Sequence, residues 1–142
     1  MIDEKAEFAS RFIQALPHAR ALGMTLTALD KGVAGIDMAY ADHLVGDPKT
    51  GVIHGGAVSA LMDTCCGAAV MSLPGAVGTA TIDLRIDYMR PATPQQTIRA
   101  RAECYHVTRT VVFVRATATD DADDPPVATA TGAFTIERKE TE

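Results

Sequence analysis

The chain of 142 residues has the length of one domain, and 47% of its residues are hydrophobic, which suffices for a core. Its net charge of -5 argues against nucleic-acid binding, which normally requires a basic surface. The start of the chain lacks the pattern of a signal peptide, and no apolar run reaches the ~20 residues of a membrane span. We therefore expect one cytoplasmic domain, residues 1–142, that binds neither nucleic acid nor a membrane.

The first element expected is a short amphipathic helix within residues 1–17. Pro17 is expected to end it, because proline cannot continue a helix. The apolar residues at helical spacing are Ala6, Phe8, Ala9, Phe12, Ile13 and Leu16.

Two strands and a loop are expected next. Residues 24–29 and 33–40 have the composition of strands, and the turn at 30–32 joins them. The glycines and proline within residues 41–51 predict a loop.

Residues 55–71 form the most apolar segment of the chain and predict a long buried helix. Asp63 is the single charged residue between Lys49 and Asp83. Because a lone carboxylate is costly to bury among apolar side chains, a working role is the simplest explanation for it. The alternative is a structural Asp63 that is merely hydrogen-bonded.

The start of this helix is a candidate anion site. Free N–H groups and a positive dipole end lie there, and the pair Gly55-Gly56 lets a ligand approach the backbone closely. The nine residues from His54 to Asp63 place them about 180° apart and ~13 Å along the axis. Bringing both to one substrate therefore requires the helices of two subunits in a symmetric dimer. The alternative for His54 is an ordinary loop residue.

The remainder of the chain predicts a sheet. Residues 82–88 and 98–104 alternate apolar and polar side chains, so one face of each strand is expected to be buried. Residues 111–119 and 127–136 continue the pattern. Only the 55–71 helix is apolar enough to cover that face, so we expect an α+β fold in which an antiparallel sheet wraps around one long central helix.

Charged and thiol groups leave further alternatives. Residues 85–115 hold six arginines against Asp87 and Glu103, which suits either a phosphorylated ligand or the solvent face of alternating strands. The three cysteines have no metal-ligand spacing and are expected to be buried thiols. The four aspartates in residues 120–124 suit a hairpin tip better than a calcium loop. No metal site is predicted.

The motif Gly51-Val52-Ile53-His54-Gly55-Gly56, with Asp63 nine residues after the histidine, and the motif Asp87-Tyr88-Met89-Arg90-Pro91-Ala92 carry a resemblance. Over residues 20–137 the chain resembles the hotdog-fold acyl-CoA thioesterases of the phenylacetate pathway (PaaI-like, related to 4-hydroxybenzoyl-CoA thioesterases). The resemblance implies a hotdog fold and hydrolysis of acyl-CoA without a cofactor or metal. It also implies dimers, usually paired into tetramers, with active sites at the dimer interface.

The resemblance also implies roles for individual residues. Gly55 would donate its backbone N–H to the thioester carbonyl, and Asp63 of the other subunit would activate water or attack directly. His54 would orient the site, and Thr81 would place a hydroxyl near the reacting water. The substrate-binding residues implied are Gly56, Arg90, Arg109 and Thr110, the last three along the coenzyme A channel.

The chain departs from the family pattern at two positions. Relatives often carry an Asn-Pro pair shortly before the histidine, whereas this chain has Asp47-Pro48 one residue further away. An ionised Asp47 cannot donate a hydrogen bond to a carbonyl. Some relatives have a hydroxyl one turn after the catalytic acid, where this chain has Gly67, which leaves room either for an acyl chain or for close helix packing.

Two other functions fit the same sequence. A hotdog hydratase or dehydratase would need an acid and a base at the acyl chain, but His54 is expected at the helix mouth. A non-catalytic acyl-CoA-binding domain would leave the ionisable Asp63 without a purpose. Release of free thiol, hydration without thiol release, and binding without turnover distinguish the three.

Overall fold

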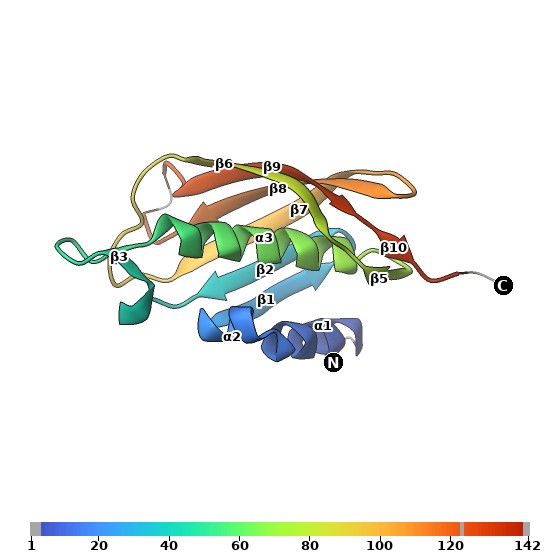
Figure 1. The fold of residues 1–142 in the computed structure, drawn as a ribbon, viewed down its shortest axis with the longest axis horizontal. Coiled ribbons are helices and arrows are strands. Elements are labelled where there is room, and N and C mark those ends of the chain that lie inside the picture. Colours follow the sequence, from blue (N-terminus) through green and yellow to red (C-terminus); the bar gives the residue numbers. More distant parts are fainter. Residues whose placement is uncertain (1–3, 123, 141–142) are drawn as a thin grey trace.

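Helix α3 (Gly55–Met71) lies against one face of a six-stranded antiparallel sheet (Figure 1). The computed structural model describes residues 4–122 and 124–140, without the side chains of residues 5, 6, 8–10 and 12. The expected antiparallel sheet around one central helix is confirmed, and α3 covers the residues expected for that helix.

The other elements follow in chain order. They are α1 (Glu4–Ala15), α2 (Pro17–Ala21), β1 (Met24–Asp30), β2 (Val33–Met38), a 3-10 turn (Asp42–Leu44), β3 (Val45–Asp47), β4 (Val52–Ile53), β5 (Ala76–Gly78), β6 (Thr81–Tyr88), β7 (Ile98–Val107), β8 (Val111–Thr119), β9 (Ala128–Thr135) and β10 (Glu137–Arg138). The large sheet has the order β1-β2-β7-β8-β9-β6, and the pairs β10-β5 and β3-β4 form two small sheets. Strand β6 therefore lies at an edge, beside β9.

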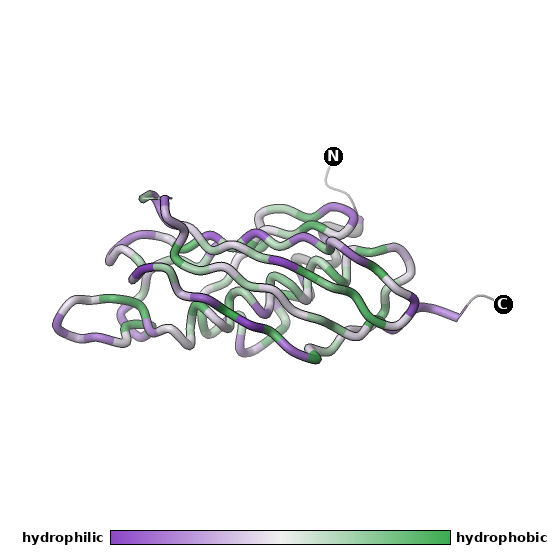
Figure 2. The backbone as a smooth tube through the Cα atoms, turned by 90° about the horizontal axis from the view of Figure 1, so that it is seen from above, coloured by the Kyte–Doolittle hydropathy of each residue, from purple (hydrophilic) through white to green (hydrophobic). Residues whose placement is uncertain are grey.

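The core forms between α3 and the inner face of the sheet. Hydrophilic and hydrophobic residues alternate along the strands (Figure 2), as the sequence predicts. Leu61 and Met62 of α3 are fully buried, and burial of each contributes about 1.5–3 kcal/mol. Small side chains on the facing strands let the helix lie close to the sheet; those buried on β7, β8 and β9 include Ala100, Ala102, Ala116, Ala118 and Ala130.

The N-terminal segment contains the predicted helix and a second, unpredicted one. Helix α1 ends at Ala15, before Pro17, as expected. Pro17 then begins α2, because its missing N–H is harmless at the first helical position. Ile13 is buried and Leu16 packs on the core. The side chains of Ala6, Phe8, Ala9 and Phe12, which the predicted apolar stripe included, lie outside the described residues.

Two further predictions need correction. The loop expected at 41–51 contains the 3-10 turn and β3, which pairs with β4. Strand β6 does not bury one complete face, because 56% of Ile82 and 51% of Tyr88 remain exposed. This exposure arises because β6 has a neighbouring strand on one side only.

The cysteines are free thiols, and Cys65 and Cys66 are buried in α3 as expected. Burial raises the pKa of Cys65 to about 12, so this group stays a neutral thiol. Cys104 is half-buried, and burial raises its pKa to about 11. Within residues 4–122 and 124–140, no helix is long and apolar enough to cross a membrane.

Candidate active site

The start of α3 exposes a backbone donor. His54 is the N-cap, and its Nδ1 accepts the Gly56 N–H at 2.7 Å. The His54 carbonyl accepts the Ala57 N–H at 3.0 Å. Within the described part of the chain, the Gly55 N–H has no acceptor, and His54, Gly55 and Gly56 are exposed. One N–H at the positive end of the helix is therefore available to an external carbonyl oxygen.

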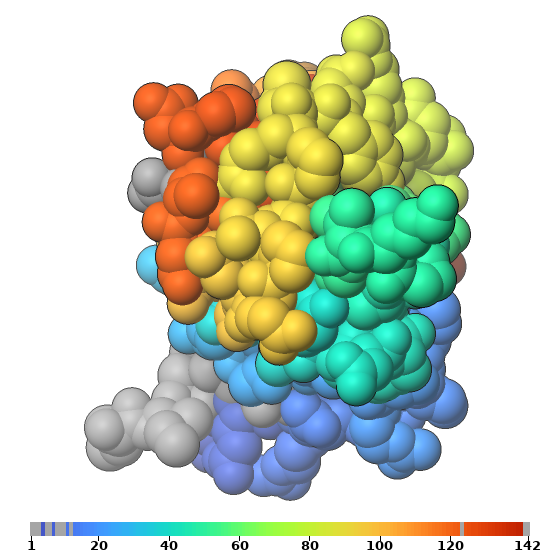
Figure 3. Space-filling view, turned by 90° about the vertical axis from the view of Figure 1, so that its left-hand side faces the viewer, coloured from blue at the N-terminus to red at the C-terminus, as the bar shows by residue number. Residues whose placement is uncertain are grey.

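The neighbouring turn holds this helix start in place. A methyl group at Gly46 would lie 2.7 Å from the His54 Cα, so only glycine permits this approach of β3. The His54 N–H donates to the Leu44 carbonyl at 2.8 Å. Figure 3 shows this end of the molecule, where the turn around Gly51 lies beside the segment that contains Pro94.

Asp47 stabilises the turn to which it belongs. Its carboxylate accepts the Lys49 N–H at 3.0 Å and the Thr50 hydroxyl at 3.0 Å, and its carbonyl accepts the Gly51 N–H at 2.8 Å. Both carboxylate oxygens are therefore occupied within the turn.

Asp63 lies in the middle of α3, beside the first residue of β6. The Thr81 hydroxyl donates to Asp63 Oδ1 at 2.7 Å, so these two predicted site residues are brought together. Asp63 is half-buried rather than fully buried, because the flank of α3 that carries it faces the edge of the sheet and a cavity. No hydrogen bond within the described residues occupies Oδ2, which is free to accept one from a ligand or water.

Strand β6 contacts both parts of the candidate site. At its other end, the Tyr88 hydroxyl donates to the Gly55 carbonyl at 2.7 Å. The eight residues from Thr81 to Tyr88 span ~23 Å of extended strand, so one chain keeps Asp63 and Gly55 apart. In the sequence, Tyr88 belongs to the alternating strand and to the Asp87–Ala92 motif, and the motif was the one signal of a further role; its contact with Gly55 appears only in the structure.

A cavity of about 230 Å³ adjoins Asp63. Its lining is mostly apolar and includes Ile13 and Leu16 from the first helical segment and Met71 from the end of α3. A methyl group added at Gly67 would contact only the Thr79 methyl, at 4.0 Å. The glycine therefore leaves space in the cavity and is not required by close packing.

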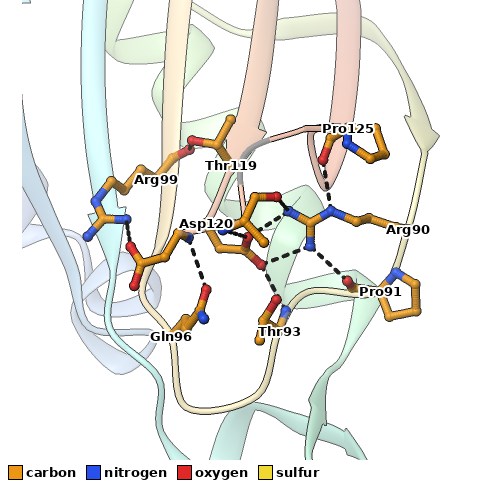
Figure 4. A network of polar contacts seen from close by, with 10 residues as sticks. Arg90, Pro91, Thr93, Gln96, Arg99, Thr119, Asp120 and Pro125 are labelled. Atoms are coloured by element: carbon orange, nitrogen blue, oxygen red, sulfur yellow. Dashed lines mark hydrogen bonds and ion pairs between the residues drawn. The ribbon is translucent and has the colours of Figure 1, made fainter.

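Arg90 lies in a network within its own chain (Figure 4). Its guanidinium binds Asp120 with two hydrogen bonds, at 3.0 and 2.6 Å, and donates to the carbonyls of Pro91, Ala122 and Pro125. The side chain of Asp120 is 0% exposed and that of Arg90 is 18% exposed. These contacts give Arg90 a structural role within the chain, and its expected place along the coenzyme A channel stays a prediction.

The other arginines of the basic segment lie mostly on the outer face of the sheet. Arg99 pairs with Asp121 at 2.9 Å, and Arg115 pairs with Glu103 at 3.3 Å. Arg109 differs, because it lies exposed in the β7–β8 turn and has no ion pair within the described part of the chain. The adjoining Thr110 carbonyl accepts the Ile136 N–H at 3.1 Å. Thr110 precedes β8, which is separated from β6 by one strand, β9.

No cluster of three or more potential metal ligands occurs among the residues that the structure describes. The aspartates of residues 120–124 are used differently from a calcium loop, since Asp120 pairs with Arg90 and Asp121 with Arg99. Asp123 lies outside the described residues.

Replacing Arg90 with Ala is expected to lower the free energy of unfolding by about 3–5 kcal/mol, because Asp120 would remain buried without its partner. The Arg90 hydrogen bonds hold the pKa of Asp120 well below its usual range. The Asp120 contribution is therefore complete above the ordinary carboxyl pKa of ~4 and is lost as the pH falls further. Urea unfolding of both proteins between pH 7 and pH 2.5 measures the difference.

Arg99→Ala is the control, because Arg99 forms exposed ion pairs that contribute at most about 1 kcal/mol. Equal stability of the Arg90 and Arg99 variants at pH 7 would contradict the structural role of Arg90.

Comparisons with known proteins identify relatives of this chain. The family profile of the thioesterase superfamily matches residues 50–126. A Halobacterium salinarum protein whose name describes an esterase is 33% identical over 126 residues, which cover 82% of each chain. The medium/long-chain acyl-CoA thioesterase YigI of Escherichia coli is 29% identical over 97 residues, which cover 56% of this chain and 61% of that protein.

Solved structures show the same architecture. A Pseudomonas aeruginosa protein is 42% identical and has a TM-score of 0.82, with 92% of this chain and 98% of that chain covered. Escherichia coli PaaI, from the phenylacetic acid degradation operon, has a TM-score of 0.83 at 21% identity, with 94% and 93% covered. The second likeness concerns the fold alone.

Proposed function

Because this chain belongs to the thioesterase superfamily, with its hotdog fold, and hydrolyses thioesters, we propose that its substrate is an acyl-CoA. The observation that carries the proposal is the arrangement along β6, where a carboxylate lies at one end and an unoccupied helix N–H at the other. Water activation and carbonyl polarisation are the two requirements of thioester hydrolysis. The acyl-CoA thioesterase YigI among the relatives supports the substrate class.

The active site is completed by a second copy of the chain. In the described sheet, β6 has a free edge, and Ile82 on this strand is exposed. A second β6 strand paired along that edge would cover both. If two β6 strands pair antiparallel about a two-fold axis near Leu84 and Arg85, Thr81 of each copy lies opposite Tyr88 of the other. Asp63 then faces Gly55 of the second copy. Pairing of two dimers into a tetramer is a further expectation from the resemblance.

In the proposed reaction, the Gly55 N–H donates to the thioester carbonyl oxygen and stabilises its developing negative charge. Asp63 takes a proton from water, whose oxygen attacks the carbonyl carbon. The C–S bond then breaks, and the proton passes to the leaving thiolate, so that a free acid and coenzyme A are formed. Thr81 holds Asp63 Oδ1, and His54 caps the helix that presents Gly55.

This reaction requires no group beyond the substrate and the two chains, because coenzyme A enters as part of the substrate. Arg109 and Thr110 are proposed to contact the coenzyme, since the turn carries an exposed guanidinium at the end of the sheet where Thr81 lies. The Gly56 N–H is already bound to His54, so Gly56 is proposed to help by letting the substrate approach the backbone closely.

Asp63→Asn is expected to lower kcat for acyl-CoA hydrolysis about 100- to 10,000-fold, because the amide cannot accept the proton of water. Thiol release and binding of acyl-CoA are measured for the same protein. Glu103→Gln, which removes an exposed carboxylate on β7 away from the candidate site, is the control and should keep wild-type activity.

An Asp63→Asn variant that kept a tenth of wild-type turnover would contradict the catalytic assignment of Asp63. Hydration of an unsaturated acyl group without thiol release would support the hydratase instead, and binding without any turnover by the wild type would support the acyl-CoA-binding domain. Appearance of ¹⁸O in the Asp63 carboxylate after a single turnover in ¹⁸O-water would identify direct attack, because it requires a mixed anhydride whose aspartyl carbonyl is attacked by water.

Mixing two inactive proteins tests the shared site. Gly55→Pro removes the backbone donor, and Asp63→Asn removes the base. A mixed dimer has one site with both changes and one with neither, so statistical exchange is expected to restore up to about a quarter of wild-type activity. Native mass spectrometry verifies the exchange, and thiol release measures the activity. Verified mixed dimers without activity would mean that Gly55 and Asp63 of one chain serve the same site.

The cavity beside Asp63 is proposed to receive the acyl group. Its apolar lining suits a hydrocarbon, and its volume is below the roughly 300–1,000 Å³ of pockets for drug-sized ligands, which suits the acyl part alone. Gly67 is the position at which a side chain would reduce this volume.

Substitutions at Gly67 are expected to change acyl preference in order of size. Gly67→Ala adds a methyl group in open space and should leave the profile unchanged, whereas Gly67→Leu should lower kcat/KM for octanoyl-CoA at least about 10-fold more than for acetyl-CoA. Thiol release with a series of acyl-CoA substrates measures the profile. An equal loss for short and long acyl groups in the Leu variant would place the acyl group elsewhere.

A further inference from the structure

The peptide group between Gly55 and Gly56 is held at both of its polar atoms. The Tyr88 hydroxyl donates to its carbonyl at 2.7 Å, and its N–H donates to His54 Nδ1 at 2.7 Å. The first contact comes from the edge strand β6 and the second from the N-cap of the helix. These two bonds fix the orientation of a peptide that has no side chain of its own to hold it.

This restraint matters because of where the peptide lies. Two successive glycines have the greatest backbone freedom, and the first turn of a helix lacks its full set of hydrogen bonds. Gly55 and Gly56 are also exposed, so core packing does not restrain them. The free Gly55 N–H belongs to the adjoining peptide, and its direction depends on the torsion angles of Gly55.

We infer that Tyr88 is a positioning residue for the Gly55 N–H. The inference rests on the proposed function, in which this N–H stabilises the oxyanion. An oxyanion donor is effective only when its direction is set before the reaction. By holding the Gly55 carbonyl, the Tyr88 hydroxyl fixes one side of the residue whose other side carries the donor.

The surroundings of Tyr88 favour this role over core packing. The side chain is half-exposed, and three of its atoms would lie 3.7 Å from a methyl group at Gly55, so it covers the helix start. Packing alone would not require the hydroxyl. The same strand places Thr81 on Asp63, so β6 positions the donor at one end and the base at the other.

The test is Tyr88→Phe, which keeps the ring and removes the hydrogen bond. We expect kcat to fall about 5- to 10-fold, as for the loss of one hydrogen bond, while KM changes less than about 2-fold. Tyr105→Phe is the matched control, because Tyr105 is 47% exposed and its hydroxyl has no hydrogen bond within the described part of the chain. The control should keep wild-type kcat.

A second measurement follows the backbone directly. In ¹H–¹⁵N spectra of the folded proteins, the amide signals of Gly55 and Gly56 should shift in the Tyr88 variant and stay in place in the Tyr105 variant. An unchanged kcat with shifted amide signals would make the bond merely structural and overturn the inference. A higher KM with unchanged kcat would make Tyr88 a substrate contact, and loss of folding in the Phe variant would make its hydroxyl a folding requirement; either overturns it.

The wild-type protein and the Asp63→Asn variant are assayed beside these two. If the wild type releases thiol and the Asp63→Asn variant does not, the proposed function stands whatever Tyr88 does. If neither releases thiol, the proposed function fails, and the inference about Tyr88 fails with it, because the Gly55 N–H then has no oxyanion to stabilise.

Discussion

Burial of α3 against the sheet is the interaction on which the rest of the structure depends. The helix is apolar around most of its circumference, and its fully buried residues meet the small side chains of β7 and β8. Because the sheet covers only part of the helix, one flank remains beside the edge strand and a cavity. Asp63 lies on that flank, where a carboxylate keeps contact with solvent and with Thr81.

The edge position of β6 connects the fold to the chemistry. A central strand would be hydrogen-bonded on both sides, whereas β6 leaves one edge free and spans the distance between the base and the helix start. Its two hydrogen bonds to α3 join Thr81 to Asp63, the proposed base, and Tyr88 to Gly55, the proposed oxyanion donor. The proposed symmetric dimer would explain both the exposed edge and the separation of these two groups within one chain.

Charge is used for structure more than the sequence suggests. The network around Asp120 joins Arg90 to a loop thirty residues away, and the outer-face arginines are mostly paired with nearby carboxylates. Loss of Arg90 would leave the buried charge of Asp120 without a partner and lower the stability of the fold, whereas exposed ion pairs contribute little to stability. The position of an arginine in the basic segment thus does not show whether it belongs to a buried or an exposed ion pair. Arg109 differs from the others, because it is exposed and has no ion pair within the described part of the chain.

The sequence by itself determined the helix at 55–71, the alternating strands and the candidate pair of Asp63 and Gly55, because periodicity and the isolation of one charge are local properties. Only the tertiary structure decided that β6 lies beside β9 at the sheet edge, that Arg90 binds Asp120, and that Tyr88 holds Gly55. Pro17 likewise begins a second helix, α2, which packs against β1. The physical reason is that a periodic pattern reports which face a side chain occupies, whereas its partners depend on contacts between segments far apart in the chain.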